Sequence, residues 1–439
     1  MNVTWVNHAS FIFEYDGIRL ITDPWMEGTA FDNGWALLSN TVLQYEDFST
    51  ITHIWFSHEH PDHFSPPNLN KIPKAYREKI TVLFQNTTDR KVADYCRKAG
   101  FGTVVEMETD KYYSLSANVQ CKCNPFTDGD SWLYIKTDKY NLLNLNDCII
   151  CTPEDAKSIQ AKTGPVDILF TQFGYANKVG NTDDVKEREE ASAEKLRRIA
   201  IQQQVFAPKA IIPFASYVYF CHEENKYMNN GMNRVDRVYD FITDTLKTET
   251  VVLYPGDQWE ALTAHDSTAA ISKYLADYRK IDSNEVSYVA HPAKVEVKEL
   301  ATAAEKFTEK ILQINQQVSF VKKYPTMKIW LTDYQQAFGF DFRKQLHQTG
   351  YTQDTCDISL SSNALLYSFK HLWGGDSLQI NARFQTPANG NYYRARSFYE
   401  LAAMANRGES SNNKAAFKHC LALSPYAGIL KSIYRLVKK

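Results

Sequence analysis

The segment of this sequence richest in metal-binding groups reads SHEHPDH and places three imidazoles and two carboxylates within six residues. His58 and His60 point to the same side if the segment is extended, because side chains alternate along a strand. A turn at Pro61 can then bring Asp62 and His63 round to face a second point. Two such ligand sets suit borderline metals such as zinc, iron or manganese. The spacing therefore predicts a site for one or two divalent metal ions.

The elements around this segment are expected to be strands that alternate with helices. The apolar run ITHIWFSH ends at the histidines, and the β-rich runs VTWVNHASFIFEY and IRLITDPW are separated by the turn signal Asp16-Gly17. A helical pattern covers DRKVADYCRKAG, which ends at Gly100, and another covers residues 185–205. Further strands are read at KITVLFQ, GTVVEME, SWLYIKT, YNLLNLNDCIIC, VDILFTQF and AIIPFASYVYF. This alternation predicts an α/β or mixed α+β sandwich.

The HxHxDH spacing resembles the signature of the metallo-β-lactamase superfamily, which implies an α+β fold of four layers (αβ/βα). The resemblance implies that His58 and His60 bind a first metal and that Asp62 and His63 serve a second. Where only one metal is present, it implies that Asp62 handles a proton. Asp147 follows the apolar run of LLNLNDC and fits the aspartate that bridges two metals in this superfamily.

One region departs from the superfamily pattern. The histidine that usually precedes the bridging aspartate is missing, because the corresponding region reads CNPFTDGDSWLYI. Asp128 or Asp130 could replace it as a harder oxygen ligand, which would shift the preference towards iron or manganese. Otherwise the site is mononuclear or incomplete. His222 lies where the superfamily often supplies a late histidine after a strand, so the resemblance implies a further ligand there and, with Asp62, a catalytic role.

A closer resemblance covers about residues 1–260. The segments DPWMEGTAFDNGWALL, SHEHPDHFS, NLNDC, PFASYVYFCHEENKYMN and LYPGD occur in this order and resemble the catalytic domain of the CMP-N-acetylneuraminate hydroxylase family. Members of that family are iron-dependent monooxygenases that act on a nucleotide sugar. The resemblance implies a sugar pocket lined by Trp25 and Trp35. It also implies contacts to a phosphate or carboxylate from Lys226, Tyr227 and Asn230.

Two reaction classes follow from these resemblances. The hydroxylase family carries a Rieske domain with C-x-H ligands, and this sequence has no C-x-H, so an oxygenase would need electrons from a separate Rieske or ferredoxin protein. The first domain also resembles L-ascorbate-6-phosphate lactonases and N-acyl-phosphatidylethanolamine phospholipases D, in which the metal lowers the pKa of a bound water. We therefore expect a hydrolase of an ester, lactone, amide or phosphodiester of a small, sugar-derived substrate. An iron oxygenase is the alternative, and a non-catalytic metal-binding protein is the third hypothesis.

The length of 439 residues predicts more than one domain. Residues 1–262 are expected to form the metal-binding domain, 263–318 a helical linker region, and 319–439 a smaller α+β domain. In the last, VSFVKKY, MKIWLTDY, CDISL and SLQINARFQ read as strands and NALLYSFKHLW as a helix. This part resembles a sterol carrier protein-like domain, and a packing or dimerisation module is the alternative.

The composition bounds the partners and the compartment. A net charge of −2 with interspersed signs argues against nucleic acid as the main ligand, so a small molecule, such as a sugar or sugar nucleotide, is expected. The sequence shows neither a signal peptide nor an apolar run long enough to span a membrane. Eight scattered cysteines then predict reduced thiols and a cytoplasmic location. The oligomeric state does not follow from the sequence.

Overall fold

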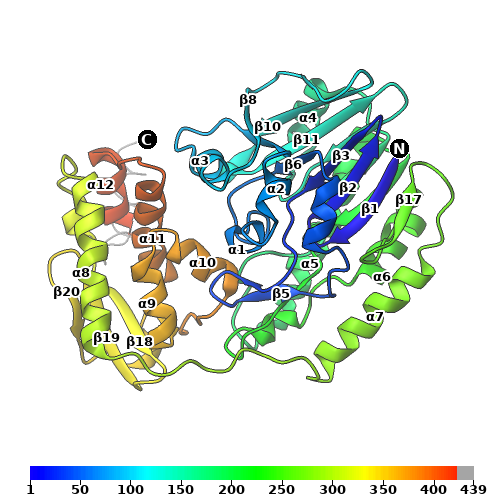
Figure 1. The fold of residues 1–439 in the computed structure, drawn as a ribbon. Helices are drawn as coiled ribbons and strands as arrows, with labels where there is room; N and C mark the ends of the chain where they lie inside the picture. The colour runs from blue at the N-terminus through cyan, green and yellow to red at the C-terminus, as the bar shows by residue number, and fades with distance from the viewer. Residues whose placement is uncertain (423–439) are drawn as a thin grey trace, which may run out of the picture. The chain divides into compact units, whose positions relative to one another are not determined.

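The computed structural model describes residues 1–422, apart from the side chains of Asp128, His419, Leu421 and Ala422, so part of the third expected segment (423–439) lies outside the description. The chain divides into two compact units (Figure 1). Unit 1 comprises Met1–Ala176, Val185–Cys221 and Asn229–Tyr288, and unit 2 comprises Asn177–Asp184, His222–Met228 and Val289–Lys439. Residues 263–318, expected to be a linker, contribute one long helix to each unit. None of the helices among the described residues combines the length and apolar character needed to cross a bilayer.

The first of two seven-stranded sheets in unit 1 begins with a meander of antiparallel strands and continues with parallel strands. Its order is β17-β1-β2-β3-β6-β7-β8. From β3 to β8 the strands are parallel, so β3 and β6 end at the same edge. In sheet order the strands span Gln258–Glu260, Asn2–Asn7, Ser10–Tyr15, Ile18–Thr22, His53–Phe56, Thr81–Gln85 and Thr103–Met107.

The second sheet has the mirror organisation, with parallel strands at one side and antiparallel strands at the other. Its order is β16-β14-β13-β12-β11-β10-β9, and β12, β13, β14 and β16 are parallel. In sheet order the strands span Glu249–Thr250, Ala210–Phe214, Ile168–Gln172, Asn141–Asn144, Ser131–Thr137, Val119–Pro125 and Tyr113–Ser114. A small third sheet joins β15 (Val218–Phe220), β5 (Trp35–Leu37) and β4 (Thr29–Ala30).

The two large sheets pack face to face because their strands carry apolar side chains on both faces. On β2, Phe11 belongs to the central core, whereas the next residue, Ile12, belongs to a second core on the outer side. Phe11 stacks on Phe170 of β13 with 4.2 Å between the ring centroids. The following residue, Thr171, donates a hydrogen bond of 2.6 Å to Gln202 of α5 (Val185–Phe206). Since neighbouring residues of a strand point to opposite faces, α5 covers the outer face of the second sheet.

Helices also cover the outer face of the first sheet, which completes the four layers. Val92 and Cys96 of α3 lie in the outer core with Ile54 of β6. The predicted four-layer α+β fold is therefore confirmed for unit 1. Besides α5, its helices are α1 (Pro66–Leu69), α2 (Lys74–Arg77), α3 (Lys91–Lys98), α4 (Pro153–Thr163), α6 (Val235–Asp240) and α7 (Thr268–Asp282), with short turns of helix at Tyr45–Thr50, Thr127–Gly129 and Phe241–Thr245.

The β-rich run VTWVNHASFIFEY is divided into β1 and β2 by a turn at His8 and Ala9. His8 has a φ of +39°, in a region that residues other than glycine seldom adopt. The strand register also shifts between Trp5 and Asn7. These features place His8 at the end of a strand, beside the ends of β3 and β6, rather than in the middle of one.

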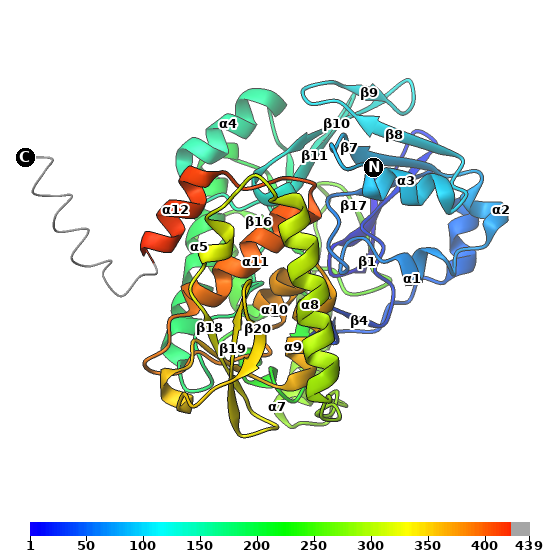
Figure 2. The same cartoon turned by 90° about the vertical axis from the view of Figure 1, so that its left-hand side faces the viewer.

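Unit 2 is a smaller α+β domain, as predicted, and its strands and helices can be followed in Figure 2. Its sheet has the order β20-β19-β18-β21, with β18 antiparallel to β19 and parallel to β21. Phe340 of β19 packs between Phe307 of α8 and Phe398 of α11, with ring centroids 5.9 and 5.2 Å away. The strands span Gln345–Gln348, Gln336–Asp341, Met327–Leu331 and Ile358–Leu360, and the helices are α8 (Val297–Ile314), α9 (Ser362–Lys370), α10 (Gly374–Asn381), α11 (Tyr392–Asn406) and α12 (Asn413–Ala422).

Two of the strands predicted in unit 2 are helical instead. VSFVKKY contains a single turn of 3-10 helix at Val321–Lys323, and most of SLQINARFQ lies in α10. The run SLQINA alternates like a strand, but Leu378 and Asn381 are also three residues apart and both are buried, which suits one face of a helix. A side chain at Gly375 would meet Tyr399 of α11 at 2.2 Å, so this glycine allows α10 to approach α11 closely. The resemblance to a sterol carrier protein-like domain stays a prediction.

Candidate metal centre

The candidate ligands lie where strands of both sheets end. Asp23 follows β3, and His58 follows β6 after one residue, at the shared edge of the first sheet. Asp147 follows β12 in the second sheet, and Asp130 directly precedes the antiparallel strand β11. Polar side chains therefore gather at the ends of parallel strands, the usual place for ligand sites in sheets of this kind.

The HxHxDH segment folds back on itself after His60, as the sequence predicts. The backbone N–H groups of His63 and Phe64 both donate to the carbonyl of His60, at 3.0 and 2.7 Å. The turn leaves Nε2 of His58 2.8 Å from Nδ1 of His60. Desolvation lowers the pKa of both rings, so each is held neutral, the state in which imidazole binds a metal.

His63 is fully buried and lies at the centre of the cluster. Its Nε2 is 3.2 Å from Oδ2 of Asp62 and 3.4 Å from Oδ2 of Asp147. Desolvation alone would lower the pKa of His63, but Asp62 and Asp147 raise it well above the ordinary value. The carboxylates of Asp62 and Asp147 thus favour a positive charge at Nε2 of His63.

Asp23, which sequence reasoning did not identify, fixes the other side of the His63 ring. Its Oδ2 is 3.0 Å from Nδ1 of His63 and also accepts hydrogen bonds from Ser57 Oγ at 2.7 Å and Asn146 Nδ2 at 2.5 Å. A carboxylate that accepts from Nδ1–H leaves Nε2 free for a metal, an arrangement common around metal-bound histidines. The only signal in the sequence is an aspartate directly after a predicted strand.

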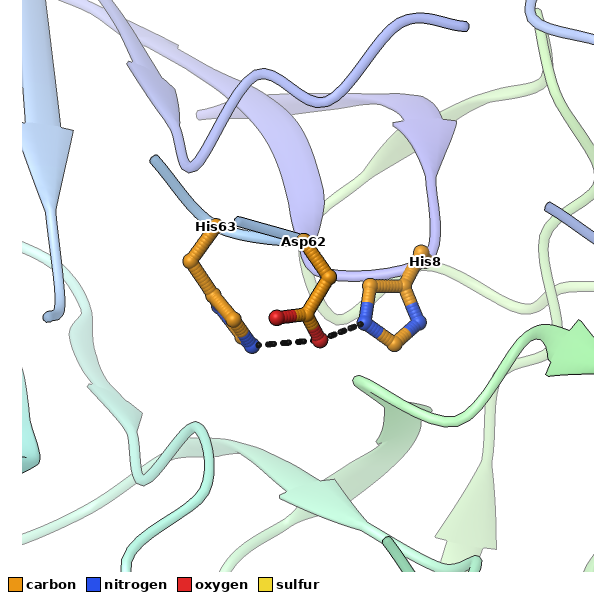
Figure 3. Close-up of side chains that lie close together, drawn as sticks. All are labelled: His8, Asp62 and His63. Atoms are coloured by element: carbon orange, nitrogen blue, oxygen red, sulfur yellow. Dashed lines mark hydrogen bonds and ion pairs between the residues drawn. The ribbon is translucent and has the colours of Figure 1, made fainter. Parts of the chain in front are cut away.

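His8 is a second residue that sequence reasoning missed. Its Nε2 lies 3.3 Å from Oδ2 of Asp62, so Asp62 sits between His8 and His63 (Figure 3). The ring is 2% exposed and packs edge-on against Trp25, with 5.8 Å between centroids. Within the β-rich run this histidine has no neighbouring ligand, and only the turn after Asn7 directs it towards residues 54 positions away.

The unpaired atoms of the cluster fit a divalent metal. Oδ1 of Asp62 is buried and makes no hydrogen bond to any described residue, and Nε2 of His63 faces only the carboxylates of Asp62 and Asp147. Ligand atoms lie within 4.8 Å of one another in two groups, His8–Asp62–His63 and His58–His63–Asp147. His63 belongs to both groups, so the donor set accommodates one ion directly, and a second requires the remaining ligands to be shared differently. Mixed imidazole and carboxylate donors suit zinc, iron or manganese.

Asp130 and Asp128 are the two candidates for the missing histidine. Oδ1 of Asp130 lies 3.7 Å from Nε2 of His58, and the residue is 7% exposed. The side chain of Asp128 lies outside the described part of the chain. Of the two, Asp130 is the carboxylate that the structure places beside His58.

The remaining predicted site residues lie elsewhere. His222 belongs to unit 2, where its Nδ1 is 3.8 Å from Glu224, so its role as a ligand stays a prediction. Trp25 and Trp35 are 1% and 3% exposed and pack against protein side chains. In unit 2, Lys226 pairs with Glu223, and the Tyr227 hydroxyl is 3.3 Å from the Ala382 carbonyl. In unit 1, the backbone carbonyl of Asn230 accepts a hydrogen bond from Nε of Arg188. The predicted substrate contacts of these five residues stay predictions.

Comparison with known proteins identifies the domain that carries the cluster. Residues 2–189 match the sequence model of the beta-lactamase superfamily domain, and all of them except residues 177–184 lie in unit 1. A Mycolicibacterium smegmatis protein named as a Rieske 2Fe-2S iron-sulfur protein is 26% identical over 188 residues, 40% of this chain and 35% of that protein. Cytidine monophosphate-N-acetylneuraminic acid hydroxylase of Xenopus laevis is 33% identical over 101 residues, 23% of this chain and 17% of the hydroxylase. The chain thus spans about a third or less of the length of these relatives.

Two solved structures align with part of this chain. The isothiocyanate hydrolase from Delia radicum gut bacteria aligns with a TM-score of 0.42 at 13% identity, over 59% of this chain and 98% of that one. The diiron beta-hydroxylase CmlA from Streptomyces venezuelae aligns with a TM-score of 0.36 at 16% identity, over 66% of this chain and 52% of that one.

Proposed function

Because residues 2–189 match the sequence model of the beta-lactamase superfamily domain, we propose that unit 1 is a metal-dependent hydrolase that cleaves an ester, lactone, amide or phosphodiester bond of a small substrate. The observation that carries this proposal is the convergence of His58, His63 and Asp147, whose ligand atoms lie within 4.8 Å of one another. A sugar-derived substrate is part of the proposal, since the sequence resembles proteins that act on such molecules.

We assign the ligands from their positions. His58, His60 and Asp147 would hold a first ion and Asp62 and His63 a second, since Asp62 and His63 are fully buried while His60 and Asp147 are partly exposed. When bound, a divalent ion supplies a Lewis acid that polarises the scissile bond and lowers the pKa of water to near neutral. Asp23 keeps the His63 ring oriented through Nδ1.

Asp62 has the geometry of a proton acceptor if one ion occupies the outer ligands. Its Oδ2 lies between His8 and His63, whereas Oδ1 has no hydrogen-bond partner among the described residues. Although burial opposes it, His63 and His8 hold the pKa of Asp62 well below its ordinary range, so the carboxylate is ionised at neutral pH. If a second ion is bound, Oδ1 of Asp62 would instead serve as one of its ligands.

A second candidate function is an iron-dependent oxygenase that receives electrons from a separate Rieske or ferredoxin protein. Asp130 favours it, because an oxygen ligand beside His58 makes the donor set harder and suits iron better than zinc. The named hydroxylase among the matching relatives supports it as well.

Metal analysis with matched assays tests the proposal. Protein purified anaerobically is analysed for metals and assayed on p-nitrophenyl acetate, bis(p-nitrophenyl) phosphate and a simple lactone, without reductant. The hydrolase predicts turnover of at least one probe that chelation abolishes and added zinc or manganese restores, with Asp147→Asn inactive and exposed Asp240→Asn unaffected. Bound iron, no hydrolysis and oxygen uptake only with reductant would move the assignment to the oxygenase. Failure to bind zinc, iron or manganese would overturn both functions.

A further inference from the structure

A lysine stands behind the candidate metal centre and is connected to it through one amide. Lys195 lies on α5, the helix that covers the outer face of the second sheet, and its side chain is partly buried. Its ammonium donates to Oε1 of Gln172, the last residue of β13. The Nε2 group of Gln172 donates to Oδ1 of Asp147 at 2.9 Å. Lys195, Gln172 and Asp147 thus form a chain from the helix to the metal ligand.

The orientation of the amide follows from the lysine. An ammonium group can only donate, so it selects the oxygen of Gln172 and turns the NH2 group towards Asp147. With Oδ1 of Asp147 occupied, Oδ2 is left facing Nε2 of His63 at 3.4 Å. This explains the position of Gln172, but an uncharged donor at position 195 would serve the same purpose.

The charge of Lys195 is not explained by its contacts. Its one side-chain hydrogen bond among the described residues is to a neutral amide. Arg198, on the same helix, is engaged by Glu194 and adds repulsion. Desolvation, followed by Arg198, lowers the pKa of Lys195 to about 8. The ammonium is thus still charged at neutral pH, although a partly buried charge is costly without an ionic partner.

The carboxylates that favour this charge act at longer range and are committed to the metal. Asp147 and Asp130 both attract Lys195, and neither contacts it. A divalent cation bound to Asp147 would neutralise the negative charge of that carboxylate. The ammonium of Lys195 would then lie near the cation, and an anion would stabilise both positive charges. Asp147 is 17% exposed at its side chain, Cys151 is exposed and Lys195 is partly exposed, so this side of the cluster is in contact with solvent.

We propose that Lys195 binds an anionic group of the substrate, a carboxylate or a phosphate, beside the metal centre. The inference rests on the proposed function and narrows it to substrates that carry a negative charge a few ångströms from the bond that reacts. Lys195 has donors left after the bond to Gln172, and a charge-assisted hydrogen bond from one of them fixes the anion.

Calorimetric titration of zinc-loaded protein with inorganic phosphate and with acetate tests the inference. Lys195→Met keeps the length of the side chain and removes the charge, and it should weaken binding of at least one of the two anions by about tenfold or more. Lys195→Arg should stay within about threefold of the wild type. Lys186→Met, an exposed lysine on the same helix, is the matched control and should change nothing. A larger loss for phosphate indicates a phosphorylated substrate, and a larger loss for acetate indicates a carboxylated one.

Gln172→Met separates anion binding from positioning. This variant breaks the link to Asp147 but keeps the ammonium. The affinity for zinc should therefore fall more in Gln172→Met than in Lys195→Met, whereas the affinity for the anion should fall more in Lys195→Met. If both variants weaken zinc and anion in the same proportion, Lys195 only positions Asp147 and the inference is overturned. Unchanged anion binding in Lys195→Met also overturns it. Anion binding through Lys195 without hydrolysis would refute the proposed function alone, whereas hydrolysis together with unchanged anion binding in Lys195→Met would refute the inference alone.

Discussion

Unit 1 and unit 2 each bury a histidine beside carboxylates, but only the cluster in unit 1 lacks a permanent cation. In unit 2, Oε2 of Glu224 is 2.7 Å from Nε of Arg383, which is 1% exposed at its side chain, and His222 lies 3.8 Å from the same oxygen. In unit 1, Asp62 contacts only His8 and His63 among ionisable groups of the described residues. The two clusters therefore differ in what neutralises the carboxylate.

The pKa directions of the two histidines reflect this difference. Desolvation, followed by Arg383, lowers the pKa of His222 to about 4, so it stays neutral. Asp62 and Asp147 raise the pKa of His63 well above its ordinary value in spite of desolvation. A buried histidine next to a carboxylate thus indicates a metal only where no guanidinium or ammonium already supplies the positive charge.

The largest expected effect comes from removing a ligand in unit 1. His63→Ala leaves Asp62 and Asp147 without their shared partner, so the chain should lose most of its bound metal and at least about a thousandfold in kcat/KM. Elemental analysis and the hydrolase assay measure both quantities. His222→Ala should keep its metal. Loss of metal from His222→Ala would instead establish His222 as the ligand that the sequence predicts.

Arg383→Met should destabilise unit 2 by about 3–5 kcal/mol, because it removes the guanidinium from Glu224, whose side chain is only 12% exposed. Urea unfolding, followed by a probe in unit 2, gives the change in the free energy of unfolding. The exposed pair Arg396–Glu400 provides the control, and Arg396→Met should cost less than about 1 kcal/mol. Equal losses in the two variants would show that Arg383 is not the neutralising charge.

Asp23→Asn should weaken zinc binding by about 10- to 100-fold without removing a ligand, because a neutral amide oxygen accepts from the Nδ1–H of His63 more weakly than the carboxylate does. A competition titration with a chromophoric chelator measures the affinity. An affinity equal to that of the wild type would mean that Ser57 and Asn146 alone orient the ring.

The pH dependence of stability should reveal the neutral state of His222. Its folded pKa of about 4 is below the ordinary 6.5, so the unfolded chain binds more protons between these values and stability falls as pH decreases through them. His222→Gln should reduce the loss between pH 7 and pH 5 by about 1–2 kcal/mol, as measured by urea midpoints at both pH values. Parallel pH profiles for the two proteins would contradict the assigned pKa.

Local spacing made part of the site predictable. His58, His60, Asp62 and His63 lie within six residues, and the structure brings them together around a turn at Pro61. Periodicity likewise predicted the layered α+β fold of unit 1, because strands buried on both faces and a long amphipathic helix leave strong patterns.

Contacts between distant parts of the chain were not predictable in the same way. His8 and Asp23 reach Asp62 and His63 from 54 and 40 positions away, and neither has a ligand neighbour in sequence. In unit 2, the alternation of SLQINA fits either a strand or a helix, and close packing at Gly375 against Tyr399 decides for the helix. Tertiary packing determines such short segments, and it is not encoded in their local pattern.

The ligands come from both halves of the sandwich, with Asp62 and His63 after β6 of the first sheet and Asp147 after β12 of the second. An ion bound by both sets would link the two sheets to each other. An ion that binds only the folded state also stabilises it. The free energy of unfolding of unit 1 should therefore rise with the concentration of free metal, by about 2.7 kcal/mol at one hundred times the dissociation constant. Metal supply would set the working lifetime of the domain as well as its chemistry.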